Sequence, residues 1–177
     1  MHGIIYTQLQ QFIVSQYDYQ TWFQILDMAG LKNRSYYPAQ IYHDMEAQAI
    51  VAAICKKFDL SESRVLENFG LYISANLLKI YSSSINPSWK LLDLLEHTED
   101  EMHKAVRFAD KNASPPALVC RRTSPDQVIL EYSSPRKMID LGIGIIKGFA
   151  DHYKENIIID RLETDGKVIL TITLARF

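Results

Sequence analysis

The sequence contains little cysteine, no long apolar run and almost no net charge. Two cysteines, Cys55 and Cys120, are too few for a disulfide framework or a four-thiolate zinc site, and we expect both to be reduced in a cytoplasmic protein. The net charge of −2 gives no electrostatic argument for nucleic acid as a partner. The longest apolar run, Ala49 to Cys55, is far shorter than the ~20 residues that span a membrane. We therefore expect neither a nucleic-acid partner nor a membrane partner.

Motifs of catalysis and of phosphate binding are also absent. There is no Gly-x-Ser-x-Gly elbow, no Gly-x-x-x-x-Gly-Lys loop and no His-x-x-x-His pair. The N-terminus has no basic stretch, and glutamines interrupt its apolar residues, so we expect no secretory signal peptide. We interpret two acidic clusters, Asp44/Glu46 and Glu99–Glu101, as solvated helix faces and helix N-termini rather than catalytic carboxylates. These absences give poor support to nucleophilic catalysis.

The first half of the chain has the periodicity of helices. Near the N-terminus, apolar residues recur at the spacing of one helix face: Ile5, Leu9, Phe12 and Ile13. Further helices are predicted over about residues 19–29, 39–58, 61–81 and 89–96. Thr98-x-x-Glu101 is a capping-box pattern, so we expect another helix to begin there and to end before Pro115-Pro116. Its predicted apolar face consists of Met102, Ala105, Val106 and Ala109.

The second half of the chain changes to the alternating pattern of strands. Residues 118–122 and 127–132 predict one hairpin, and residues 157–162 and 168–174 predict a second around Asp165-Gly166. A helix over about residues 135–153 separates them, and its Gly142 and Gly144 favour close packing. The order predicts an α+β fold with a four-stranded antiparallel sheet. We expect residues 1–177 to form one domain, with a helical N-terminal lobe over about 1–60 and an α+β lobe over about 61–177.

The most informative segment is Tyr132-Ser133-Ser134-Pro135-Arg136, where a strand gives way to a helix. Pro135 suits the first helical position, which makes Ser134 the N-cap and places Arg136 in the first turn. A cation there opposes the helix dipole, so stability alone does not explain it. A phenol, a hydroxyl, free backbone N–H groups and a guanidinium together indicate an anion site for a carboxylate or phosphate. The alternative is a capped helix whose Arg136 pairs with a nearby acidic side chain.

His103 is the most distinctive of the five histidines. It lies beside the apolar residues Met102 and Val106, in a helix that ends at a Pro-Pro break. A single histidine next to an apolar face is commonly a core or surface residue. A neutral imidazole facing an apolar cavity is also how haem iron is held on its proximal side. Spacing alone does not separate these two interpretations.

The sequence resembles the haem nitric oxide/oxygen binding family, the H-NOX domain. Tyr132-x-Ser134-x-Arg136 is the Tyr-x-Ser-x-Arg motif of that family, and His103 lies 12 residues before Pro115, as its histidine does. The Met-x-Gly opening, the length and the order of the predicted elements are also similar. The resemblance therefore covers essentially the whole chain. Each motif is weak alone, but the three in this order are fairly specific.

The resemblance implies a cofactor, haem b, enclosed by the sheet and helices. It implies that His103 is the axial ligand of the iron. By the same resemblance, Tyr132, Ser134 and Arg136 bind the haem propionates, and a guanidinium suits this because it can bind a carboxylate through two hydrogen bonds. Two further residues are expected to contact the porphyrin: Pro116 would press on the ring and distort it, and Ile5 would pack near its edge.

One departure from the family concerns which gas the protein binds. Members that bind dioxygen stably carry a tyrosine five positions after the motif arginine, and here that position is Leu141. The positions that align with other distal polar residues are Leu9 and Ile73. An apolar pocket offers bound dioxygen no hydrogen bond, so it favours nitric oxide and carbon monoxide. A phenol that reaches in, such as that of Tyr72, would weaken this inference.

The resemblance implies a bacterial-type gas sensor that is not itself an enzyme and signals to a separate protein. Nitric oxide would weaken the iron–His103 bond, and the released helix would shift relative to the N-terminal lobe. We expect the partner to be a histidine kinase or a cyclic-di-GMP enzyme, as for similar stand-alone members. Three alternatives stay open: a dioxygen sensor, a haem-free module that binds another carboxylate ligand, and a thiol sensor that uses Cys55 and Cys120.

Overall fold

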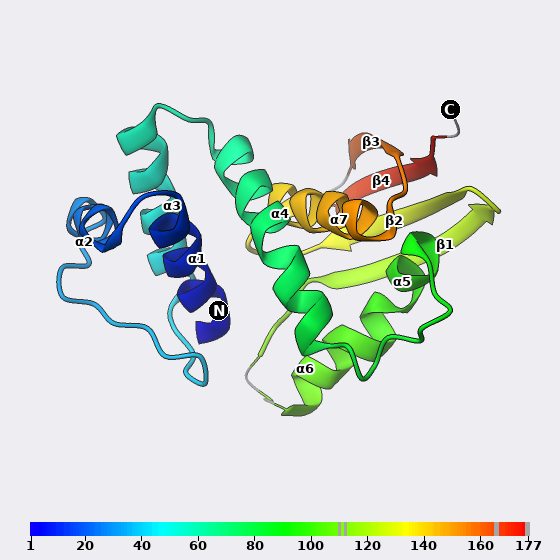
Figure 1. Ribbon diagram of the computed structural model, residues 1–177, viewed down its shortest axis with the longest axis horizontal. Helices are drawn as coiled ribbons and strands as arrows, with labels where there is room; N and C mark the ends of the chain where they lie inside the picture. The colour runs from blue at the N-terminus through cyan, green and yellow to red at the C-terminus, as the bar shows by residue number, and fades with distance from the viewer. Residues whose placement is uncertain (110, 112, 165–166, 176–177) are drawn as a thin grey trace.

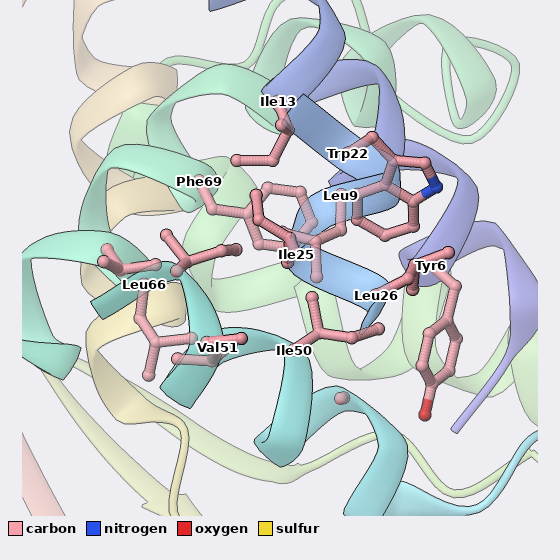
Figure 2. Packing of buried hydrophobic residues seen from close by; sticks show 14 of the residues in the cluster. Tyr6, Leu9, Ile13, Trp22, Ile25, Leu26, Ile50, Val51, Leu66 and Phe69 are labelled. Carbon is pink, nitrogen blue, oxygen red and sulfur yellow. The ribbon is translucent and has the colours of Figure 1, made fainter. Parts of the chain in front are cut away.

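The chain folds into a group of N-terminal helices, a long central helix and a sheet covered by helices (Figure 1). The computed structural model describes residues 1–109, 111, 113–164 and 167–175. The first three helices are α1 (Gly3–Gln16), α2 (Tyr19–Met28) and α3 (Asp44–Phe58). They enclose a buried apolar cluster together with the first part of α4 (Glu62–Ile80). Figure 2 shows this cluster, in which Tyr6, Trp22 and Phe69 are almost completely buried.

The predicted starts of the N-terminal helices are confirmed for α2 and α4 but not for α3. Ser61 caps α4 by accepting a hydrogen bond from the Arg64 N–H at 3.3 Å. The helix predicted from residue 39 begins only at Asp44, with His43 as its N-cap. The chain before it instead makes a turn, in which Gln40 N–H donates to the Tyr37 carbonyl, and then a β-bridge from Ile41 to His2.

The predicted helix start at Thr98 is wrong. Three segments run on without a break: α5 (Leu91–His97), a π-helical segment η1 (Thr98–His103) and α6 (Lys104–Ala109). The Thr98 hydroxyl does not cap a new helix, because it donates to the Leu94 carbonyl one turn earlier at 2.7 Å. Of the predicted apolar face, Met102 is buried, Val106 is half-buried and Ala105 is exposed; the side chain of Ala109 lies outside the described residues.

The predicted α+β class and four-stranded antiparallel sheet are confirmed. The strands are β1 (Ala117–Ser124), β2 (Gln127–Ser133), β3 (Ile157–Thr164) and β4 (Lys167–Leu174), in the spatial order β1-β2-β4-β3. Alternate residues of the two central strands point into a second buried cluster, shared with α5 and α7 (Ile139–Tyr153). The predicted turn residues Asp165 and Gly166 lie outside the described part of the chain.

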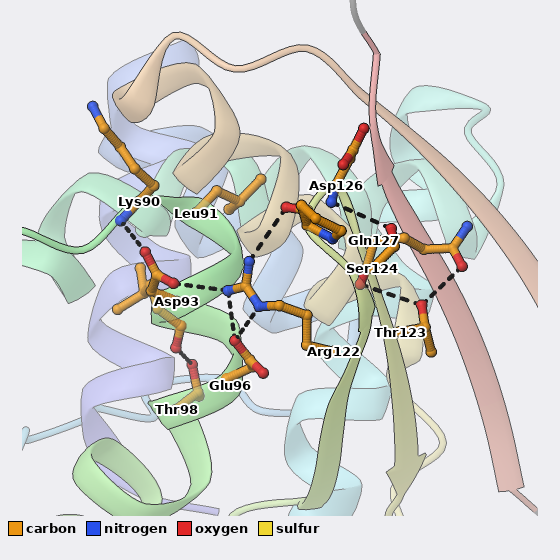
Figure 3. A network of polar contacts seen from close by, with 12 residues as sticks. Lys90, Leu91, Asp93, Glu96, Thr98, Arg122, Thr123, Ser124, Asp126 and Gln127 are labelled. Atoms are coloured by element: carbon orange, nitrogen blue, oxygen red, sulfur yellow. Dashed lines mark hydrogen bonds and ion pairs between the residues drawn. The ribbon is translucent and has the colours of Figure 1, made fainter.

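An ion pair and a close helix crossing hold the helices in place. The ion pair joins α5 to the sheet, and the crossing joins α4 to α7. Arg122 of β1 binds α5 through Asp93 Oδ1 at 2.7 Å and Glu96 Oε2 at 2.7 Å (Figure 3). Helices α4 and α7 cross in backbone contact, because a Cβ on Gly144 would lie 2.0 Å from the Glu67 carbonyl oxygen. Close packing was predicted for Gly144 and is confirmed there. At Gly142 it is not needed, because a Cβ there would meet only a side-chain carbon at 3.8 Å.

The helix after β2 begins four residues later than predicted. Ser134 does not cap it; the Ser134 carbonyl accepts from Lys137 N–H at 3.2 Å, which closes a turn with Pro135 at its second position. Lys137 then has a left-handed backbone with a φ of 53°, which no right-handed helix can include. Helix α7 therefore starts at Ile139, and its first turn carries Asp140. The cations at 136 and 137 therefore belong to the turn before the helix and not to its first turn.

No helix in the described part of the chain is both long enough and apolar enough to cross a membrane.

Candidate functional site

His103 lies at the end of the π-helical segment, with its side chain 18% exposed. Its Nδ1 is 3.0 Å from Glu99 Oε2. Burial lowers the pKa of His103, while the hydrogen bond to Glu99 and the backbone of Pro116 act in the opposite direction and do not cancel the shift. The ring is therefore favoured in its neutral form, which is the form that binds a metal ion.

The Pro-Pro segment lies directly beside this histidine. Residues 113–116 lead into β1, and the backbone of Pro116 makes a hydrogen bond with the His103 ring. Glu99 extends the connection, because Oε2 also accepts the Leu118 N–H at 3.1 Å. Leu118 is the register partner of Tyr132 in the β1–β2 ladder. The Glu99 side chain thus connects His103 to β1, and β1 pairs with the strand that carries Tyr132.

The corner after β2 gathers the predicted anion-binding groups. Tyr132 is 7% exposed, and its phenol contacts the Ser134 side chain and the Met138 backbone. Burial raises the pKa of Tyr132, so the phenol stays a neutral hydrogen-bonding group. Ser134 Oγ accepts the Arg136 N–H at 3.2 Å. A hollow of about 300 Å³ opens beside Tyr132 and Ser134, and four charged side chains also line it: Lys137, Arg161, Lys167 and Glu163, of which Glu163 binds Arg161.

Arg136 turns away from that hollow and joins the corner to the N-terminal lobe. Its Nε lies 2.9 Å from Asp44 Oδ2, and one terminal nitrogen donates to the Ser114 carbonyl. Asp44 also binds the N-terminal ammonium at 2.6 Å. The acidic partner that the sequence left open is therefore present. Although burial raises it, the hydrogen bond from the N-terminus and the nearby positive charge of Arg136 hold the pKa of Asp44 below its usual value.

These contacts leave Arg136 able to bind a further anion. Nε is buried and lacks a hydrogen bond of good geometry, in spite of its short distance to Asp44. A guanidinium has five N–H donors, and the contacts to Asp44 and Ser114 do not use them all. With the neutral imidazole of His103 and the hydroxyls of Tyr132 and Ser134, the donor set fits a metal porphyrin with acidic side chains.

The predicted distal positions are apolar and packed. Leu9 and Ile73 are 2% and 1% exposed in the N-terminal cluster, and Leu141 and Ile5 pack against it half-buried. The Tyr72 ring packs at a tilt against Phe12, with ring centroids 5.3 Å apart and an interplanar angle of 54°, and Tyr72 lines a hollow of about 550 Å³ along α1.

In three other tyrosines of this lobe, the hydroxyl group already donates a hydrogen bond. Tyr6 donates to the His43 carbonyl at 2.7 Å, Tyr36 to Glu46 at 2.9 Å, and Tyr42 to Gln40 at 2.9 Å. A phenol has a single hydrogen to donate. These tyrosines therefore cannot donate to a ligand in the same pocket without breaking a present bond.

Sequence reasoning missed Glu99 and Asp44 as parts of the site. Both were interpreted as solvated carboxylates, yet Glu99 binds His103 and Asp44 binds Arg136. The spacing of four residues between Glu99 and His103 was the available signal, because such pairs face each other on a helix. No comparable signal relates Asp44 to Arg136, which are 92 positions apart along the chain.

The comparisons with known proteins define the class. Residues 2–161 match the Haem-NO-binding family, and the chain belongs to this family. Its fold is that of an H-NOX protein from S. oneidensis in the Fe(II)NO ligation state. The two are 24% identical in sequence, and they superpose with a TM-score of 0.91 over 99% of this chain and 100% of that chain. The fold is also that of an oxygen-binding H-NOX domain related to soluble guanylate cyclases, solved as an oxygen complex: 24% identity, 99% and 96% coverage, and a TM-score of 0.82.

A curated relative is much longer than this chain. Soluble guanylate cyclase 89Db of Drosophila melanogaster is 23% identical in an alignment of 147 positions, which covers 77% of this chain and 20% of that protein. The chain thus spans about a fifth of that relative. H-NOX domains are haem-based gas sensors, not catalytic modules, and the family binds haem and gases such as nitric oxide and dioxygen.

Proposed function

We propose that this domain binds haem b through His103 and senses nitric oxide. The observation that carries the proposal is the apolar character of positions 9, 73 and 141, in a lobe where three buried phenols are already engaged. Bound dioxygen depends on a hydrogen-bond donor for its stability, whereas nitric oxide and carbon monoxide depend on it less. Such surroundings therefore support selection of nitric oxide and carbon monoxide.

The proposed cofactor contacts follow from the chemistry of each group. The haem, when bound, supplies the iron atom to which the gas binds. His103 would hold that iron, Tyr132, Ser134 and Arg136 would bind the propionates, and Pro116 would contact the ring. Ile5 and Leu141 would add apolar contacts. The cofactor would be haem b, held without covalent attachment, because neither cysteine begins a Cys-x-x-Cys-His motif.

The proposed signal is a shift of the helix that carries His103. Release of the imidazole from its metal would free residues 91–109 from the site, and Glu99 connects this helix to β1. The Arg136–Asp44 ion pair connects the same corner to the N-terminal lobe. A gas can shift the equilibrium between the two positions of this helix only as far as it binds one of the two conformations more tightly than the other.

The decisive experiment is the visible absorption spectrum of the purified protein supplied with hemin and reduced. We expect a ferrous haem spectrum that changes with nitric oxide and with carbon monoxide but shows no durable oxygen complex in air. A durable oxygen complex would establish the dioxygen sensor instead. A protein that takes up no haem would favour the module that binds another carboxylate ligand.

A thiol sensor is the least supported alternative. Burial raises the pKa of Cys55, and it raises the pKa of Cys120 to about 12. The reactive form of a cysteine is the thiolate, which both sites disfavour. Free, unreactive thiols also support our proposal of a cytoplasmic location.

We further propose that the partner is a histidine kinase or a cyclic-di-GMP enzyme. This rests on family resemblance, so it needs a direct assay. We expect the haem-loaded domain to change the autophosphorylation or cyclic-di-GMP turnover of a candidate partner, and nitric oxide to alter that change. A response that is identical with and without nitric oxide would exclude the candidate.

A further inference from the structure

The π-helical segment places a carboxylate against the histidine that precedes α6. Within η1, the Lys104 N–H donates to the Glu99 carbonyl, the i to i+5 pattern of a π-helix. Glu99 and His103 both belong to this segment, and their side chains meet with Nδ1 and Oε2 3.0 Å apart. Single π-turns inside α-helices occur frequently at functional sites.

The Glu99 carboxylate is held by three donors from three different places. His103 Nδ1 and the Leu118 N–H both bind Oε2, at 3.0 and 3.1 Å. Arg107, one turn further along α6, binds Oε1. The side chain is only 28% exposed, so it is fixed in one orientation rather than moving freely in solvent.

A carboxylate on Nδ1 determines what the other ring nitrogen can do. In the neutral ring, a proton on Nδ1 leaves the lone pair on Nε2, which is then the metal-binding atom. Metal-binding histidines commonly donate their second N–H to a carboxylate or carbonyl, which fixes the ring and raises its donor strength. The anionic acceptor found here is stronger than a backbone carbonyl.

We propose that Glu99 is a positioning residue that sets the tautomer and donor strength of His103, with Arg107 opposing it. This rests on the proposed function, because it concerns the bond between His103 and the haem iron. Glu99 strengthens that bond and so resists its rupture by nitric oxide. Arg107 draws electron density from the same carboxylate, so the two side chains tune the bond in opposite directions.

Two substitutions separate this role from a structural one. Glu99→Gln keeps an oxygen acceptor for Leu118 but removes the charge. It should lower the iron–histidine stretching frequency in the resonance Raman spectrum and lower haem affinity by about tenfold, the smaller end of the usual effect for such partners. Arg107→Gln should raise the same frequency. If Glu99 and Arg107 were needed only for folding, the two substitutions would shift the stretching frequency in the same direction.

The control is Glu101→Gln, which makes the same change at an exposed position of the same segment. Its frequency should equal that of the wild type. If Glu99→Gln also equals the wild type, or if Glu99→Gln and Arg107→Gln shift together, the proposal is overturned.

A haem-free measurement separates this inference from the proposed function. In ¹⁵N NMR spectra of the apo-protein, His103 should be in the Nδ1–H tautomer, and Glu99→Gln should give a mixture. If the wild type binds no haem but shows this difference, the proposed function fails and the positioning role of Glu99 stands. If the tautomer is the same in both proteins, the positioning role fails, whatever the haem content.

Discussion

At the scale of the residue, burial and a carboxylate together determine the state of the His103 ring. Burial favours the neutral ring, and Glu99 favours the proton on Nδ1. The two effects agree on one outcome, a lone pair on Nε2. An exposed histidine near pH 7 would instead be divided among charged and neutral forms.

We expect His103→Gly to remove the bond between the protein and the iron, and added imidazole to restore haem binding. The cavity left by the side chain can admit free imidazole as a replacement ligand. The visible spectrum of the ferrous protein measures both effects. His152→Gly, an exposed histidine in α7, is the matched control and should leave the spectrum unchanged. A normal spectrum in His103→Gly without imidazole would show that another residue is the ligand.

A second prediction at this scale concerns the gas. Leu141→Tyr should allow an oxygen complex to persist in air, because it places a hydroxyl donor where the chain has an aliphatic side chain. Leu141→Phe brings the same ring without the hydroxyl and should not have this effect. The measurement is the lifetime of the oxygen-dependent absorption after mixing with air. Equal lifetimes in the two variants would mean that the hydroxyl does not reach the ligand.

Sequence reasoning identified the residues with distinctive chemistry, but not the residues that support them. His103, Tyr132, Ser134 and Arg136 stand in recognisable motifs. Glu99 and Asp44 look like ordinary surface acids because a carboxylate has no sequence pattern that reveals its partner. Only the folded chain shows that each one lies against a cation or an imidazole.

At the scale of the element, the crossing of α4 and α7 leaves no room for side chains. Ala at position 144 would place a methyl group 2.0 Å from the Glu67 carbonyl oxygen, so the helices would have to separate. We expect Gly144→Ala to lower the free energy of unfolding by about 1–3 kcal/mol, the usual cost of overpacking. Urea unfolding of the two proteins measures the difference.

Gly142→Ala is the control for that substitution, in the same helix two residues away. Its added methyl group meets only a side-chain carbon at 3.8 Å. It should be neutral or stabilise the protein by about 0.5–1 kcal/mol, because Ala restricts the unfolded chain more than Gly does. If both variants lose the same stability, the crossing of α4 and α7 would not be the cause.

The elements themselves were predictable where a period or a cap is strong. The two hairpins and the Ser61 cap follow directly from alternation and side-chain chemistry. The helix boundaries that were predicted wrongly have a common cause. The residues expected to cap a helix make a different local hydrogen bond in the folded chain. Ser134-Pro135 made a turn, and Thr98 bonded backward to Leu94 inside a continuing helix. A π-turn has no known sequence signature, so η1 was not foreseeable.

At the scale of the whole molecule, Asp44 joins the N-terminal helices to the corner after β2. It contacts both the N-terminal ammonium and Arg136. Its pKa is lowered in the folded protein, so its contribution to stability is present above the ordinary Asp pKa of 3.8 and is lost as the pH falls toward the lowered value. The side chain is 36% exposed, which limits the contribution to about 1 kcal/mol through solvent screening.

We therefore expect Asp44→Asn to be less stable than the wild type at pH 7, and we expect this difference to shrink as the pH falls below 3.8 toward the lowered pKa of Asp44. Urea unfolding at pH 7 and at a series of lower pH values measures the difference. Asp126→Asn, a partly buried acid in the β1–β2 turn at the other end of the sheet, serves as a comparison that leaves the bond between the lobes intact. A stability difference for Asp44→Asn that does not depend on pH would contradict the assigned cause.

The division of the chain into lobes near residue 60 stays a prediction. The apolar clusters show how the two parts are built: the first extends into α4 as far as Ile73 and takes in Met138, and the second fills the space between the sheet and its helices. Periodicity gives each helix a buried face, but it does not say which of two clusters that face will enter.

The separation of these two clusters has a mechanical consequence. Among the described residues, Leu77 of α4 and Ile145 of α7 pack partly buried against both. A movement of one half therefore passes to the other through two helices that touch backbone to backbone at Gly144, while the interior of each half stays dry. Such a joint can carry a movement from end to end without partial unfolding.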